Sequence, residues 1–217
     1  MKLDFLGYLY FATLLLAMIC SLYRYKILDK ASRIFSFFVV LSAIAEFIAC
    51  FFAKKYHNNI PVYTIYSLIE FGFISLYFNY SIDVFISNKI GYYIGFAGIT
   101  WGIINIIFLQ GLNRMNSYFL IIEGLLIICM ALFSFFRLFL KYDQLLLHRY
   151  HHFWFATILV FFWSITFLNW SFYEYFIIKH KEEMWIVNSS ILIVNIITYL
   201  AISFVFILYS KMTRTIE

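Results

Sequence analysis

The sequence has little charge and almost no proline. Only 12% of its 217 residues are Asp, Glu, Lys or Arg, and Pro61 is its single proline. Soluble domains carry about 25% charged residues, so water is not the only solvent of this chain. One proline and eight glycines also exclude a low-complexity or disordered protein.

Cysteine and recognisable catalytic motifs are scarce as well. The three cysteines lie in apolar stretches, where a thiol acts as a small hydrophobe and gives no information about the redox compartment. There is no Gly-x-Ser-x-Gly elbow, His-Glu-x-x-His zinc motif or glycine-rich phosphate loop. The last apolar stretch has no retinal-binding lysine, and Asp83 and Asp143 fall in connections rather than forming an intramembrane protease pair. These absences favour a non-enzymatic protein without a metal site or cofactor, and they leave an intramembrane lipid hydrolase as the enzymatic alternative.

Long hydrophobic stretches dominate what remains, since 65% of the residues are hydrophobic. A helix that crosses about 30 Å of hydrocarbon at 1.5 Å per residue needs about 20 apolar residues. The boundary with the weakest signal is 81–89. The sequence predicts an all-α integral membrane protein with a single seven-helix domain over residues 1–217, whose spans are approximately 5–23, 34–53, 60–80, 90–109, 117–137, 153–173 and 185–209.

Basic residues predict the orientation of these spans. The first connection carries Arg24, Lys26, Lys30 and Arg33, and short loops rich in Lys and Arg stay in the cytoplasm. We therefore expect the N-terminus outside and the C-terminus in the cytoplasm. Because the basic residues flank the spans, the net charge of +5 indicates contact with the lipid bilayer and no direct binding of nucleic acid.

Three acidic residues interrupt the spans: Glu46, Glu70 and Glu123. An ionised carboxylate at the centre of a bilayer costs about 3 kcal/mol on insertion scales, so each should face the protein interior or be protonated. All three fall in the outer half or at the midplane. With the amides and phenols at similar depth they form a candidate polar pocket, made of Glu46, Tyr63, Tyr66, Glu70, Tyr77, Asn105, Glu123, Asn169, Asn188 and Asn195.

Two interpretations of this pocket stay open. Tyr63, Tyr66, Glu70 and Tyr77 share one helix face, and phenol hydroxyls hydrogen-bond carboxyl groups. An externally open pocket would bind a small polar or cationic ligand or a lipid headgroup. Alternatively, protonated glutamates join helices by hydrogen bonds to Asn and Tyr and have a purely structural role.

A glycine stripe and a basic connection are the other two features. Gly91, Gly95, Gly98 and Gly102 recur at spacings of four, three and four, which permits close helix approach within the chain or in a homo-oligomer. The connection after the fifth span predicts either a positive flank or a contact with a cytoplasmic protein partner or phosphate. His148 and His152 stand four residues apart, but no carboxylate or cysteine is spaced to complete a metal site. The contact residues would be Arg137, Lys141, His148, Arg149, His151 and His152.

Several passages resemble a loosely defined group of uncharacterised bacterial seven-helix proteins. These passages are residues 58–71, Phe153-Trp154, and 185–199 with Asn188 and Asn195. The size and the all-membrane design also resemble the membrane accessory proteins encoded beside RNA-targeting CRISPR type VI-B effectors. That resemblance implies a bacterial inner-membrane protein that modulates an antiviral nuclease. The Arg-x(4–6)-His nuclease signature of one such relative is absent here.

These observations lead to one expected function and two alternatives. We expect a non-enzymatic sensor-like protein or accessory effector, perceiving a ligand from outside or assembling as an oligomer or pore, and communicating through its basic cytoplasmic loops. The alternatives are an intramembrane lipid hydrolase, with two buried carboxyls as acid and base, and a small-solute transporter.

Overall fold

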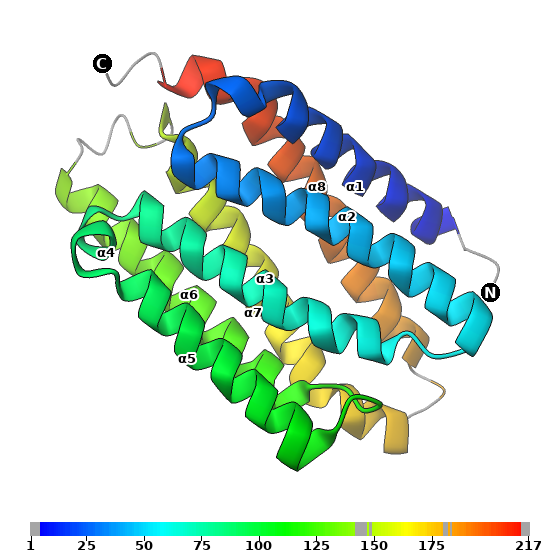
Figure 1. The fold of residues 1–217 in the computed structure, drawn as a ribbon. Coiled ribbons are helices and arrows are strands. Elements are labelled where there is room, and N and C mark those ends of the chain that lie inside the picture. Colours follow the sequence, from blue (N-terminus) through cyan, green and yellow to red (C-terminus); the bar gives the residue numbers. More distant parts are fainter. Residues whose placement is uncertain (1–4, 142–146, 148, 180–181, 183, 214–217) are drawn as a thin grey trace. The chain divides into compact units, whose positions relative to one another are not determined.

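The computed structural model describes residues 5–141, 147, 149–179, 182 and 184–213, and within these ranges all the regular structure is helical (Figure 1). Among the described residues, seven helices are long and apolar enough to cross a membrane. The prediction of an all-α, multi-pass membrane protein is therefore confirmed. The seven are α1 (Phe5–Arg24), α2 (Lys30–Tyr56), α3 (Ile60–Ser81), α5 (Ile90–Ile104) with its π-helical continuation η2 (Asn105–Gln110), α6 (Ser117–Lys141), α7 (His151–Lys179) and α8 (Met184–Thr213).

Large apolar side chains are exposed along each of these seven helices. Phe96 on α5 is 76% exposed and Phe5 on α1 is 79% exposed. Soluble proteins rarely expose continuous apolar surface of this kind, because water penalises it. Lipid is the solvent that fits such a surface. One example from each remaining helix is Phe51, Ile65, Phe136, Phe161 and Phe204.

The helices run beyond the apolar stretches from which they were predicted. Helix α2 was expected over 34–53, but it begins at Lys30 and ends at Tyr56. Asp29 caps its start by accepting a hydrogen bond from the Ser32 amide at 2.9 Å, and His57 ends it with a φ of 54°. Hydropathy marks only the part of a helix that needs hydrocarbon, whereas the helix itself continues to its caps.

Three short elements are absent from the sequence prediction, and one of them is the single-turn η1 (Tyr25–Ile27). Helix α4 (Asp83–Asn88) occupies most of the weak boundary 81–89, and Lys89 ends it with a φ of 55°. The π-helical η2 forms the end of the fourth span. These elements depend on local hydrogen bonds that hydropathy does not report.

The helices group into two compact units, which are described separately. Unit 1 contains Met1–Arg24 and Gly124–Glu217, and unit 2 contains Tyr25–Glu123. In unit 1, α8 packs against both α1 and α7; in unit 2, α3 packs between α2 and α5 (Figure 1). Helix α6 begins in unit 2 and continues into unit 1. The short elements η1 (Tyr25–Ile27) and α4 belong to unit 2.

Aromatic contacts hold the helices of unit 1 together. The rings of Tyr10 on α1 and Tyr199 on α8 lie 6.0 Å apart between centroids, and those of Phe155 on α7 and Phe206 on α8 lie 5.3 Å apart. Gly124 on α6 leaves room for Trp163, because a Cβ there would stand 3.1 Å from the indole. These contacts define an apolar interior for the unit.

The glycine stripe of α5 faces α3 within unit 2. All four glycines are buried, and a Cβ on Gly91 would stand 2.5 Å from the Ser75 carbonyl oxygen of α3. A Cβ on Gly98 would overlap the Phe71 ring, and one on Gly102 would overlap Leu68. The stripe therefore serves packing inside the chain, which is one of the two roles expected for it.

Candidate functional site

The site begins with the hairpin formed by α2 and α3 in unit 2. The Asn58 side chain accepts a hydrogen bond from the Ile60 amide at 3.0 Å, and Pro61 occupies the first turn of α3, where its missing N–H costs nothing. This short connection makes the two helices antiparallel. Residues equally distant from it along each helix therefore stand opposite each other.

Two polar pairs join the helices of this hairpin. The Tyr63 hydroxyl donates a hydrogen bond to Oε2 of Glu46 at 3.1 Å. One turn further into the hairpin, the hydroxyls of Ser42 and Tyr66 share a hydrogen bond of 2.6 Å. The half-buried Glu46 carboxyl is thus positioned by a neighbouring helix, as the structural interpretation of the glutamates requires.

Glu70 extends this polar line along α3. It is half-buried and lies within electrostatic reach of Glu46, so the two carboxylates repel each other when both are charged. Such a pair resists holding two negative charges in an apolar setting. A shared proton or a cation would relieve the repulsion.

The start of α6 lies alongside α3 and runs in the same direction. Helix α5 is antiparallel to α3, because Gly91 faces Asn79 near the end of α3 whereas Gly102 faces Leu68 nearer its start. The turn after α5 reverses the chain again. The rings of Phe71 on α3 and Phe119 on α6 then meet at 6.0 Å between centroids.

The aromatic contact also indicates where Glu123 and Ser75 lie. Each lies four residues after one of the two rings, which is one helical turn along the same face of parallel helices. Both are fully buried, at 0% exposure. Glu123 is also within electrostatic reach of Glu70. Unit 2 therefore brings together the three glutamates predicted from the sequence; we refer to Glu46, Glu70 and Glu123 as the carboxyl cluster.

Glu123 differs from Glu46 in its hydrogen bonding. Neither of its carboxyl oxygens has a hydrogen-bond partner among the described residues, and the same holds for the Ser75 hydroxyl. A buried polar group without a partner costs about 1–3 kcal/mol, and more when it is charged. A carboxyl in this position is suited to take up a cation or a hydrogen-bond donor from outside the protein.

Two other residues of the predicted pocket contribute to packing and to a turn. The buried Tyr77 packs its ring on Phe35 of α2, with 5.2 Å between centroids. Asn105 hydrogen-bonds Gln110 and Asn116 at the end of its own span. Both side chains therefore support the arrangement of their own helices, and their part in a common pocket stays a prediction.

The three remaining pocket residues belong to unit 1. Asn169 on α7 is half-buried, Asn188 on α8 is exposed and Asn195 on α8 is half-buried. Their membership of a common pocket stays a prediction as well.

An amide cluster at the α5–α6 turn was not singled out from the sequence. Oε1 of Gln110 accepts hydrogen bonds from Nδ2 of Asn105 at 2.8 Å and from the Tyr118 amide at 3.3 Å. Nε2 of Gln110 donates to the Ser117 hydroxyl at 2.8 Å. Asn105 also donates to the buried Asn116. The amide residues on both sides of the turn were the feature of the sequence that could have indicated this cluster. The cluster fixes where α6 begins.

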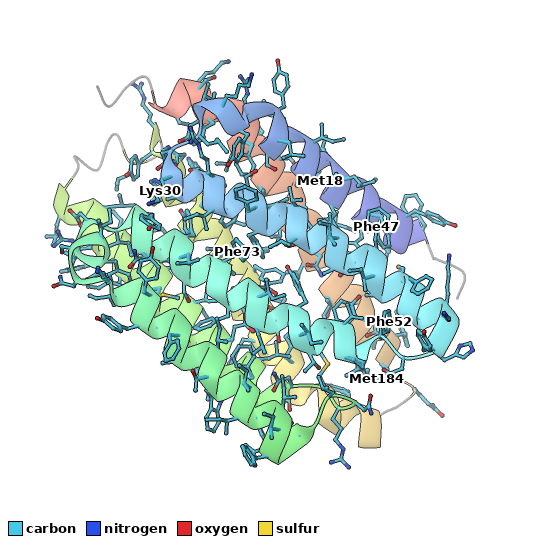
Figure 2. The ribbon with its side chains drawn as sticks, in the orientation of Figure 1. Met18, Lys30, Phe47, Phe52, Phe73 and Met184 are labelled. Carbon is cyan, nitrogen blue, oxygen red and sulfur yellow. The ribbon has the colours of Figure 1, made fainter. Side chains whose placement is uncertain are left out.

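The far end of the α2–α3 hairpin carries a cation and two phenols. Lys30, marked at the start of α2 in Figure 2, places its ammonium 3.9 Å from the centroid of the Tyr80 ring on α3. The Tyr80 hydroxyl shares a hydrogen bond with that of Tyr92 on α5. This group links three helices at their ends, and cation–π contacts of this kind stabilise exposed sites by about 0.5–1 kcal/mol.

The predicted cytoplasmic contact residues are not all at the surface. Arg149 is exposed and Arg137 is half-buried. His151 and His152 are buried, at 5% and 3% exposure, and their expected role as contacts for a partner stays a prediction. Apolar rings cover them, including Tyr209 at 4.4 Å between centroids from His151. The Lys141 side chain and residue His148 lie outside the described part of the structure.

Comparison with known proteins adds no relative. No family model, no curated protein and no solved structure matches the chain. The functional argument therefore depends on the residues themselves.

Proposed function

We propose that the chain is a non-enzymatic, sensor-like protein of the bacterial inner membrane that binds a small cation at the carboxyl cluster. Its N-terminus lies outside and its C-terminus lies in the cytoplasm in this proposal. The ligand enters from the outer side, and the bound state is transmitted through the short basic loops. The orientation rests on the distribution of Lys and Arg, and the ligand class rests on the cluster.

The observation that supports the proposal most is the state of Glu123. Its carboxyl is fully buried, has no hydrogen-bond partner among the described residues, and lies within electrostatic reach of Glu70. A carboxyl used only to join helices would be hydrogen-bonded, as Glu46 is to Tyr63. A buried acid without such bonds reduces the stability of the fold. Acidic residues inside membrane spans commonly mark ion or substrate sites.

The cluster also indicates the charge of its ligand. Glu70 lies within electrostatic reach of both Glu46 and Glu123, so it interacts with two other acids in the same unit. A cation would offset their mutual repulsion in a low-dielectric setting, whereas an anion would increase it. The Tyr63 hydroxyl positions the Glu46 carboxyl on one side of the site.

Thermal unfolding of the protein in lipid nanodiscs tests the proposal. At constant ionic strength, the probes would be Na⁺, K⁺, Ca²⁺, tetramethylammonium and spermidine, each added separately. A cation present at 100 times its Kd stabilises the folded state by about 2.7 kcal/mol. We expect one of these probes to raise the melting temperature of the wild type, and Glu123→Gln and Glu70→Gln to abolish that rise.

Glu182→Gln is the matched control, because Glu182 is exposed in the connection between α7 and α8. It removes the same charge from the chain outside the cluster, so the cation should raise its melting temperature as much as that of the wild type. If no cation stabilises the wild type, or if Glu123→Gln responds like Glu182→Gln, the cation site is wrong.

Other parts of the expected function rest on the sequence alone. A role beside an RNA-targeting CRISPR effector stays a prediction, as do a protein partner and a pore. Lipid hydrolysis stays the enzymatic alternative, and a lipid turnover assay of the wild type and of Glu70→Gln would test it. The glycine stripe gives no support to an oligomer, because α3 covers it within the chain.

A further inference from the structure

A pair of histidines with rings in contact lies at the start of α7 in unit 1. His151 and His152 are neighbours in sequence, and adjacent residues of a helix normally point in different directions. Here their rings lie 4.0 Å apart between centroids, with the two Nε2 atoms 3.1 Å apart. His151 is the first residue of the helix.

The pair is buried, and aromatic rings lie against it. His151 and His152 are 5% and 3% exposed. The Tyr209 ring of α8 lies 4.4 Å from His151 and the Tyr150 ring lies 5.2 Å from His152, between centroids. A neutral imidazole keeps one nitrogen lone pair available, and metal ions bind that form of the ring.

The separation of the two nitrogens matches the edge of a metal coordination sphere. Zinc–nitrogen bonds of about 2.0–2.1 Å at a tetrahedral angle place two ligand nitrogens about 3.3 Å apart. The 3.1 Å separation of the two Nε2 atoms is close to that value. The ring planes differ by 51°, and rotation about the soft Cβ–Cγ torsion allows both lone pairs to meet at one ion.

We propose that His151 and His152 form a binding site for a divalent transition metal of the zinc and copper group. Neutral imidazole nitrogens are preferred ligands of Zn²⁺, Cu²⁺ and Ni²⁺, and two of them converge here. The two rings would supply two of the ligands, and further oxygen or nitrogen donors or water would complete the coordination of the ion. The site differs from the His148 and His152 pair that helical spacing suggests, and it is independent of the carboxyl cluster.

Metal uptake by the intact protein tests the site. The full chain, purified through a tag without histidine and stripped with a chelator, would be equilibrated with Zn²⁺ alone and measured by elemental analysis. We expect about one ion per chain. Cu²⁺ bound to the same protein should give an electron paramagnetic resonance spectrum with coupling to two imidazole nitrogens.

Single variants locate the ion. His151→Gln and His152→Gln should each weaken the affinity for Zn²⁺ at least tenfold, whereas His57→Asn should bind as the wild type does. His57 is the matched control, because it is exposed at the end of α2 and its positive φ suits Asn. Circular dichroism would verify that each variant is folded. The copper spectrum is recorded on the wild type, so it tests the site even if a variant does not fold.

Two results would overturn the proposal. Absence of zinc uptake by the stripped wild type would show that the two rings do not hold a metal ion. Undiminished binding by both His151→Gln and His152→Gln would place any ion elsewhere in the chain.

Discussion

Tyr63 on α3 donates a hydrogen bond to the carboxyl of Glu46 on α2, across the hairpin that the two helices form, at 3.1 Å. The Ser42 and Tyr66 hydroxyls meet one turn away at 2.6 Å. Together these pairs fix how α2 and α3 are aligned along their length. Glu46, whose carboxyl accepts a hydrogen bond, thereby differs from Glu123, whose carboxyl has no hydrogen-bond partner among the described residues.

Tyr63→Phe should reduce the free energy of unfolding by about 1–2 kcal/mol. The substitution keeps the ring but removes the donor, so the half-buried Glu46 carboxyl loses a hydrogen bond. Denaturation by SDS, followed by circular dichroism, would measure the loss. Tyr56→Phe is the control, because Tyr56 is 55% exposed at the end of α2 in the same hairpin. Equal effects of the two substitutions would mean that the Tyr63 hydroxyl contributes nothing to the hairpin.

Gly98→Leu should separate α3 from α5 and destabilise the protein by about 1–3 kcal/mol or more. A side chain at this position would overlap the Phe71 ring, and overpacked interfaces force backbone shifts. Ala97→Leu adds similar bulk at the neighbouring exposed position, and it should be nearly neutral. Thermal unfolding in nanodiscs would compare the two. A neutral Gly98→Leu would show that α5 does not pack on α3 through the glycine stripe.

The spans were predictable because burial in lipid leaves a strong record in hydropathy. A stretch of about twenty apolar residues is rare in soluble domains and matches the thickness of a bilayer. Helices α1, α3, α5, α6 and α8 accordingly begin within one residue of their predicted positions. The ends of α2 and the existence of α4 and η2 were not predictable in this way. They depend on caps such as Asp29 and on local hydrogen bonds, which a count of apolar residues does not contain.

The site was predictable only in part, for a similar reason. The three glutamates stand out because acids are costly in lipid, and the structure places them in one unit. The difference in hydrogen bonding between these glutamates could not be inferred, since it depends on which helices are neighbours in the fold. The same holds for His151 and His152, whose rings meet although their spacing along a helix argues against it.

Gln110→Leu should loosen the turn between α5 and α6. The Gln110 amide joins Asn105, Ser117 and the Tyr118 backbone, so leucine removes three hydrogen bonds at once. We expect faster hydrogen exchange of the amides in residues 105–120, measured by mass spectrometry, and a loss of about 1–3 kcal/mol in stability. Asn113→Leu, in the exposed part of the same turn, should leave exchange in α6 unchanged. Equal exchange in the two variants would contradict a structural role for the amide cluster.

Glu123→Met and Glu46→Met should change stability in opposite directions. In the absence of ligand, Glu123→Met replaces a buried carboxyl that has no hydrogen-bond partner among the described residues, so stability should rise by about 1–3 kcal/mol. Glu46→Met instead removes the acceptor of the Tyr63 hydroxyl, so stability should fall.

The comparison separates a functional acid from a structural one. Residues kept for binding are commonly a cost to the free protein, and their removal stabilises the fold while it abolishes function. Glu123→Met should therefore melt at a higher temperature than the wild type in plain buffer, and should lose the stabilisation that the wild type gains from a bound cation. Unfolding in nanodiscs with and without the cation would measure both effects. If Glu123→Met is destabilised as much as Glu46→Met, the Glu123 carboxyl supports the fold, and the cation site loses the observation on which it depends.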